Sequence, residues 1–192
     1  MSVAEKYEKE KAWVVAYRVM EKIMPHCENS EVCGGLRRGN ETVHDIDIVA
    51  QPNDFFSIST KVGQLGGKCT PSKYSLNIDG IPVEIFIAND EKMFDVLKLV
   101  RTGSAGFNFE LAMKAHEKDL TLKYSNGLYG LYAAVQGWDS KVRKFKYYCN
   151  PLRRLHWKED DMIMTVLDEE EYLDPHNRNV QNSIFSRILE DA

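Results

Sequence analysis

Residues 34–50, GGLRRGNETVHDIDIVA, are the stretch of sequence that decides the fold. Its last seven residues, 44–50, alternate polar and apolar side chains, as a half-buried β-strand does. Because residues two apart on a strand point to one face, Asp45 and Asp47 are expected to project side by side. Two carboxylates so close repel each other and need either a proton or a cation. A hard divalent ion with oxygen ligands, Mg²⁺ or Mn²⁺, is the usual solution.

A glycine-arginine turn precedes this strand. Gly34 and Gly35 allow backbone N–H groups to turn toward an anion, and Arg37 and Arg38 add fork-shaped donors suited to phosphate oxygens. Alone, such a turn is usually an ordinary surface turn. Beside a pair of aspartates, it indicates a site for a phosphate-bearing ligand.

A third carboxylate lies in a predicted hairpin. Residues 74–78 and 81–88 are strand-like, and Asp79-Gly80 between them is a strong two-residue hairpin signal. Glu84 is the one acid inside the second strand, and alone it would be a solvent-facing residue. With paired aspartates on a neighbouring strand, we interpret it as the third member of a carboxylate cluster. Three carboxylates can hold two ions, which clamp the attacking and leaving oxygens of an in-line phosphoryl or nucleotidyl displacement.

Helices and hairpins alternate along the rest of the chain, which indicates an α+β or mixed α/β fold. On the first helix Trp13, Tyr17, Met20 and Met24 follow a 4, 3, 4 spacing and are expected to face the core, and Asn53 is expected to cap the second helix. The predicted helices cover residues 3–24, 54–65, 90–100, 104–118 and 159–167, and the remaining predicted strands cover 120–124, 128–132 and 141–149.

Composition places the chain among ordinary globular proteins. It has 192 residues, 43% hydrophobic and 28% charged, with a net charge of −4, which excludes disordered and collagen-like classes. No apolar run approaches the ~20 residues of a membrane span, and the N-terminus is too polar for a signal peptide. The four cysteines have no metal-binding or disulfide pattern. We therefore expect reduced thiols, a cytoplasmic-type compartment and no membrane partner.

The turn and strand at residues 34–48 resemble the G-S/G-x-x-R-G…G-D-x-D motif of the polymerase beta-like nucleotidyltransferase superfamily, and their form is closest to family X DNA polymerases. Three further segments follow in the family's order. Residues 101–108, RTGSAGFN, resemble its T-G-S-x-x-F-N segment. Residues 120–131, LTLKYSNGLYGL, resemble its K-L-x-x-x-G-L hairpin, and residues 171–178, EYLDPHNR, resemble its closing Y-x-x-P-x-x-R segment.

This resemblance implies an α+β fold with a catalytic palm, a mixed sheet flanked by helices, over residues 1–100. A small nucleotide-closing subdomain is implied over residues 101–192. The chain resembles the minimal viral members, which lack the N-terminal lyase and DNA-gripping region, so no lyase activity is expected. The implied reaction adds a nucleotide from a dNTP to a DNA 3′-hydroxyl, as short gap filling in DNA repair. The implied cofactors are two Mg²⁺ or Mn²⁺ ions, and the expected partners of this monomer are a dNTP and a primer–template or gapped duplex.

The same resemblance implies a role for individual residues. Asp45 and Asp47 would ligate both ions, and Glu84 would hold the catalytic ion and take the proton of the primer 3′-hydroxyl. The family usually carries Asp at this third position, so the extra methylene of Glu84 is a departure that would shift the ion or slow the chemistry. The residues expected to contact the nucleotide are Gly34, Gly35, Arg38, His44, Thr102, Gly103 and Asn108.

A basic strip is predicted to bind DNA. Residues 137–158 carry seven Lys and Arg side chains against one acid, with aromatic residues between them. Basic side chains neutralise phosphates and aromatic rings stack on bases, whereas a solvated basic strand is the alternative. The residues expected to contact DNA are Lys141, Arg143, Lys144, Lys146, Arg153 and Arg154.

Two other functions stay open at this point. The first keeps the chemistry and changes the acceptor, giving template-independent nucleotide transfer to RNA, a protein or a small molecule. The second is a non-catalytic module that binds a nucleotide or a nucleic acid, in which Glu84 marks the decay of an active site.

Overall fold

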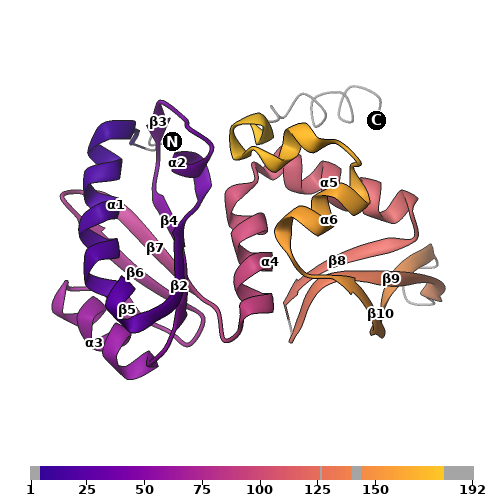
Figure 1. Cartoon of the computed structure of the whole chain (residues 1–192), viewed down its shortest axis with the longest axis horizontal. Coiled ribbons are helices and arrows are strands. Elements are labelled where there is room, and N and C mark those ends of the chain that lie inside the picture. The colour runs from indigo at the N-terminus through magenta and orange to yellow at the C-terminus, as the bar shows by residue number, and fades with distance from the viewer. Residues whose placement is uncertain (1–4, 126, 140–143, 180–192) are drawn as a thin grey trace. The chain divides into compact units, whose positions relative to one another are not determined.

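The computed structural model describes residues 5–125, 127–139 and 144–179, and it divides into two compact units, the first ending at Gly103 and the second beginning at Ser104 (Figure 1). The fold is mixed α+β, as the order of helices and hairpins predicted. The expected boundary after residue 100 falls inside a helix that the first unit keeps whole. No helix in these described ranges is both long enough and apolar enough to cross a membrane.

The first unit contains the elements from β1 to α4. In chain order they are β1 (Tyr7–Glu8), α1 (Lys9–Ile23), the 3₁₀-helix η1 (Met24–His26), β2 (Cys27–Val32), α2 (Gly34–Arg37), β3 (Thr42–Val43), β4 (Ile46–Pro52), α3 (Phe55–Gln64), β5 (Lys68–Cys69), β6 (Lys73–Ile78), β7 (Ile81–Ile87) and α4 (Glu91–Thr102).

A five-stranded mixed sheet organises this unit, with strand order β2-β4-β7-β6-β5. The pair β4–β7 is parallel, and the other pairs are antiparallel. The register places Asp47 opposite Glu84, and Glu84 opposite Ser75. Because residues in register share a face of a sheet, these three side chains lie on the same face, across three neighbouring strands.

The two faces of the sheet are covered by different helices (Figure 1). On one face α1 and α3 pack against a core of aliphatic side chains that includes Ile48 and Ile85. On the other face, Phe94 and Leu97 of α4 pack against Val49 and Phe86. Since Asp47 and Glu84 alternate with the first set of aliphatic residues, they lie on the face that α4 covers in part.

The hairpin between β6 and β7 is as predicted. Asp79 and Gly80 both have positive φ, 54° and 86°, as a two-residue type I′ turn requires, and Ile78 pairs with Ile81. The predicted cap of α3 was wrong by one residue. Asp54 caps the helix, its carboxylate accepting from the backbone N–H of Phe56 at 2.9 Å, because the chain is still extended at Asp54.

The predicted start of the first helix was wrong, and the predicted apolar stripe was right for Trp13 and Met20, which pack against the core, but wrong for Tyr17 and Met24. Tyr7 and Glu8 form β1, which pairs with β3, so α1 begins only at Lys9. Tyr17 is 66% exposed and Met24 is 54% exposed, although Met20 is buried. The buried residues of α1 include two alanines beside larger side chains: Ala12, Val15, Ala16, Val19, Met20 and Ile23. Small side chains let the helix approach the sheet closely, and the spacing of the large residues did not capture them.

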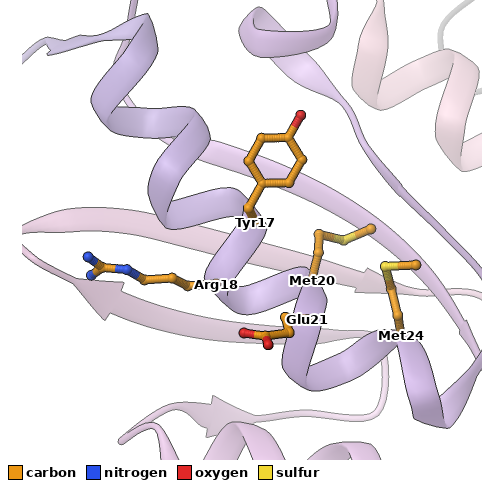
Figure 2. A pocket seen from close by; sticks show the side chains of 5 residues that line it. All are labelled: Tyr17, Arg18, Met20, Glu21 and Met24. Carbon is orange, nitrogen blue, oxygen red and sulfur yellow. The ribbon is translucent and has the colours of Figure 1, made fainter.

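The outward face of α1 mixes the exposed apolar side chains of Val14 and Tyr17 with charged ones such as Arg18 and Glu21. The Trp13 and Tyr17 rings stack, with centroids 5.4 Å apart. Further along the helix a shallow pocket is lined by Tyr17, Arg18, Met20, Glu21 and Met24 (Figure 2).

The second unit contains α5 (Ala105–Glu117), β8 (Leu120–Ser125), β9 (Leu128–Asp139), β10 (Lys144–His156), α6 (Glu159–Val166) and the 3₁₀-helices η2 (Glu170–Leu173) and η3 (Pro175–Arg178). Its antiparallel sheet has the order β10-β9-β8, and the predicted hairpin at residues 120–132 is its β8–β9 pair. The strand predicted at residues 141–149 runs further, to His156, through a register shift between Cys149 and Arg154.

A buried ion pair joins the end of this unit to its helices. Arg178 is fully buried, and its guanidinium donates to the Glu159 carboxylate of α6 and to the backbone oxygens of Tyr172, at 2.6 Å, and Leu173, at 3.1 Å. The guanidinium also lies 5.4 Å from the ring centroid of Phe107 in α5. The arginine that ends the Y-x-x-P-x-x-R-like segment is thus an internal structural residue.

Candidate functional site

Asp45 and Asp47 lie at the start of β4. The predicted strand at residues 44–50 begins two residues late, at Ile46, so the expected two-residue spacing along one strand was wrong for Asp45. Asp45 is exposed in the bend before the strand, and Asp47 is half-buried within it. The two carboxylates are still electrostatically coupled, because the charge of Asp45 raises the pKa of Asp47.

The pKa of Asp47 is raised to about 7, first by burial and then by the negative charges of Asp45 and Glu84. Arg101 and Arg38 oppose this effect and lower the pKa. A proton or a cation would relieve the repulsion among these carboxylates, as the sequence led us to expect.

The two glycines of α2 are required by packing beside this carboxylate. Gly34 has a φ of +62°, and a Cβ built on it would lie 2.3 Å from Asp47 Oδ2. A Cβ on Gly35 would lie 2.9 Å from Val43 Cγ1 and 3.2 Å from Asn40 Nδ2.

Both arginines of the turn contact the C-terminal end of α4. Arg37 Nη1 donates to Thr102 Oγ1 at 2.7 Å, and its Nε lies 3.0 Å from Glu31 Oε1. Arg38 donates to the backbone oxygen of Thr102. Burial lowers the pKa of Arg38, whereas the charge of Asp47 raises it. Thr102 is fully buried. The expected contact between Thr102 and a sugar stays a prediction.

Glu84 is paired with a lysine that sequence reasoning missed. Lys73 Nζ lies 2.6 Å from Glu84 Oε1, and both side chains are about one-third exposed, at 38% and 33%. Lys73 Nζ also lies 6.0 Å from the ring centroid of Phe86. The hairpin turn could have indicated this pair. The two-residue loop fixes the register of the two strands, which places Lys73 opposite Phe86 and diagonal to Glu84.

A second missed cation lies at Asp47. The exposed Arg101, in the last turn of α4, places its guanidinium 3.8 Å from the ring centroid of Phe86 and lowers the pKa of Asp47. Nothing in the local sequence indicates this position, because it depends on how α4 packs on the sheet.

The other residues expected to bind nucleotide are spread over both units. His44 is exposed, with Nδ1 at 2.8 Å from the backbone oxygen of Glu5. Gly103 ends α4, its N–H donating to Leu99 O at 2.9 Å. Asn108 is half-buried in α5 of the second unit.

Part of the predicted basic strip can be located. Lys141 and Arg143 lie outside the described residues, and Lys144 and Lys146 belong to β10. Arg153 and Arg154 are exposed on the same strand, next to Leu152, which is 94% exposed. The described end of the strip thus presents basic and apolar side chains to solvent.

The fit of these side chains to Mg²⁺ depends on which carboxylate is considered. Carboxylate oxygens are the ligands that Mg²⁺ prefers, and the raised pKa of Asp47 indicates a site that favours an added positive charge. The expected three-carboxylate cluster is not assembled, however. Within the described part of the chain, no group of three or more His, Cys, Asp and Glu side chains lies close enough together to hold a metal ion. The charge of Asp45 raises the pKa of Asp47, whereas Glu84 is paired with Lys73.

No protein-family model matches this chain. No curated protein matches its sequence significantly.

Proposed function

We propose that the protein is a nucleotidyltransferase of the family X DNA polymerase type, with a polymerase beta-like palm as its first unit. The observation that carries this proposal is the position of Asp47. It lies opposite Glu84 on a parallel strand pair, its carboxylate packs against a glycine that tolerates no side chain, and Arg38 and Arg101 lie near enough to shift its pKa. A carboxylate between guanidinium groups beside a glycine turn suits a phosphate and its counter-ion.

The proposed reaction adds a nucleotide from a dNTP to a DNA 3′-hydroxyl, with release of pyrophosphate. Asp45 and Asp47 would hold the ion that accompanies the nucleotide, and Glu84, once free of Lys73, would hold the second ion together with them. Bound there, Mg²⁺ or Mn²⁺ would neutralise charge on the phosphate oxygens and lower the pKa of the attacking hydroxyl. Glu84 would accept the proton of that hydroxyl, directly or through water.

The chain's own basic groups supply the remaining electrostatics. Arg38 is anchored by the Thr102 carbonyl, so its guanidinium is already ordered beside Asp47, and a preorganised donor loses little freedom when phosphate oxygens arrive. Phosphoryl-type transfer leaves little covalent chemistry for a protein to do, so positioning and charge would account for most of the rate.

DNA as the acceptor is supported by the exposed basic end of β10. Arg153 and Arg154 are exposed, and such side chains bind phosphates by releasing counter-ions. We therefore propose short gap filling in DNA repair. Template-independent transfer to another acceptor is the alternative that the experiment has to distinguish from it.

Primer extension tests the proposal. The full chain is given a gapped duplex, a single-stranded primer or a blunt duplex, with Mg²⁺ or Mn²⁺ and with dNTPs or rNTPs. We expect templated dNTP addition in the gap, and Asp45→Asn or Asp47→Asn should reduce the rate at least about 100-fold, because even the hydrogen-bond partners of metal ligands are typically worth about 10–100-fold.

The matched control is Asp79→Asn. This change removes an exposed carboxylate from the same sheet, at a positive-φ turn position that Asn accepts readily. Circular dichroism checks that every variant is folded. Extension at the wild-type rate in either aspartate variant would contradict the mechanism, and addition of all four nucleotides regardless of template would contradict gap filling.

A further inference from the structure

Strand β10 leaves its ladder with β9 over residues 150–153, which we call the β10 bulge. Cys149 pairs with Ala134 and Arg154 pairs with Tyr132, so β10 advances five residues where β9 advances two. A second register shift follows directly after Arg154. Extra residues in one strand have no partner in the other, so they are pushed out of the ladder. Because β10 lies at the edge of its sheet, the bulge is open to a partner molecule.

Two contacts hold the ends of this bulge in place. At its start, the side-chain oxygen of Asn150 accepts from the backbone N–H of Leu152 at 3.2 Å, which closes a local turn. Beyond its end, Gly130 of β9 has a φ of +128°, and a Cβ built there would lie 2.4 Å from His156 O and 3.1 Å from Arg154 Cδ. The glycine therefore lets the returning backbone and the arginine stem pass close to β9. The bulge is thus a shaped part of the sheet.

The β10 bulge presents an apolar side chain next to basic ones. Leu152 is 94% exposed, the highest exposure of any large hydrophobic side chain in the described part of the chain. Arg153 and Arg154 follow it and are exposed, and Leu155 is 46% exposed. Bulges and charges commonly protect an edge strand, which explains the arginines but not a leucine held out in water. A side chain placed in this way gains free energy when a partner covers it.

The arginines indicate the chemistry of that partner. A molecule that covers Leu152 brings its surface against two guanidinium groups, because Arg153 and Arg154 are its neighbours in the chain. A nucleic acid offers phosphates to such groups and base faces to an apolar side chain, and proteins that kink DNA insert leucine between base steps. A lipid surface fits less well, since even a myristoyl chain alone gives only marginal membrane binding and a leucine side chain is much shorter.

Insertion of an apolar side chain costs least where the base stack is already interrupted. Unstacking requires free energy, and the cost is lowest for a base that is already single-stranded. A gap in one strand of a duplex provides such a base. An apolar wedge therefore favours a gapped duplex over an intact one, whereas phosphate contacts carry no such preference.

We propose that the β10 bulge is a wedge that inserts Leu152 beside the unpaired base at a gap in DNA, while Arg153 and Arg154 contact the flanking phosphates. This inference rests on the proposed function and adds a source of specificity to it. The leucine sets the preference for the gap, and the arginines supply affinity for any duplex. Neither contribution needs a metal ion or a nucleotide.

DNA binding in EDTA, with no nucleotide present, tests the wedge. The full chain is titrated with an intact duplex and with a gapped duplex that carries 2-aminopurine at the unpaired position, a base whose fluorescence rises when it loses its stacking neighbours. We expect the wild type to bind the gapped duplex more tightly and to raise this fluorescence. Leu152→Ala should abolish the fluorescence change and weaken binding to the gapped duplex by about tenfold, because most of the buried apolar area is lost.

Three further variants separate the wedge from other effects. Leu152→Met keeps a long apolar side chain and should behave as the wild type does. Phe56→Ala is the matched control, because Phe56 is 78% exposed on α3 of the first unit, and it should change neither affinity nor fluorescence. Arg153→Gln should reduce the slope of log affinity against log salt by about 1 for both duplexes, since one phosphate contact is lost. Leu152→Ala should leave that slope unchanged.

The possible failures of the inference and of the proposed function are distinguishable. If Leu152→Ala binds the gapped duplex and raises its fluorescence as Phe56→Ala does, the wedge is refuted, and primer extension still decides the proposed function. If Leu152→Ala instead loses binding only to vesicles of anionic lipid, the partner of the bulge is a membrane and the inference is equally refuted. If the wild type binds neither duplex, with or without Mg²⁺, then the DNA polymerase function and the inference fail together.

Discussion

Replacing Gly34 by alanine tests the geometry of the site without reference to any reaction. Gly34 combines a φ of +62° with a position where an added Cβ would lie 2.3 Å from Asp47 Oδ2. The left-handed conformation costs an alanine about 1–2 kcal/mol. The clash with Asp47 adds the cost of overpacking, about 1–3 kcal/mol, because the carboxylate has to leave its place. Together we expect Gly34→Ala to lower the free energy of unfolding by about 2–5 kcal/mol.

Gly66→Ala separates the two contributions. Gly66 also has a positive φ, +77°, but a Cβ there meets no atom within 4 Å. Its replacement should therefore cost only the conformational part, about 1–2 kcal/mol. The difference between the two variants isolates the contact with Asp47.

Urea unfolding of protein labelled with 5-fluorotryptophan measures both variants, since the ¹⁹F signal of Trp13 reports the first unit alone. A second background, Asp47→Ala, removes Oδ2 and Cγ, and it should return most of the excess cost of Gly34→Ala. If Gly34→Ala costs no more than Gly66→Ala, or if Asp47→Ala gives no recovery, then Gly34 does not pack against this carboxylate and our account of the turn is wrong.

Two further predictions concern buried charges. The pKa of Asp47 is raised to about 7, so the folded state holds its proton more tightly than the unfolded state does, and the free energy of unfolding should fall as the pH rises from about 4 to about 7. Asp47→Asn should flatten this dependence in urea unfolding, and an unchanged slope would show that another group causes it. Arg178→Met leaves Glu159 buried without its cation and should cost about 3–5 kcal/mol, whereas Arg178→Met with Glu159→Leu should recover most of the loss. Thermal unfolding of the second unit measures both variants, and equal instability of the single and double variants would contradict a charge penalty.

Local patterns in the sequence were sufficient where one short segment determines the structure. Asp79-Gly80 predicts the β6–β7 hairpin, whose register places Lys73 diagonal to Glu84, although that pairing was not itself predicted. The pattern at residues 44–50 predicts β4, but the predicted start is two residues early, because His44 and Asp45 lie in a bend before the strand.

Long-range packing accounts for most of what the sequence did not predict. The face of α1 that packs on the sheet is decided by small residues such as Ala12 and Ala16, whereas the larger Tyr17 is left in solvent. Arg178 meets Glu159 and Phe107, which lie 19 and 71 positions earlier in the chain. No local sequence pattern predicts that this arginine is buried, since isolated arginines are usually exposed.

The strand order has a consequence for synthesis on the ribosome. All five strands of the β2-β4-β7-β6-β5 sheet, and the helices that cover it, come from the first 103 positions. This unit can therefore acquire its native pairing while the rest of the chain is still being translated. The second unit is completed later, because Glu159 and Phe107 can contact Arg178 only after residue 178 has been synthesised. We expect the nascent chain to protect β4 and β7 from protease early and to protect α5 and α6 only late.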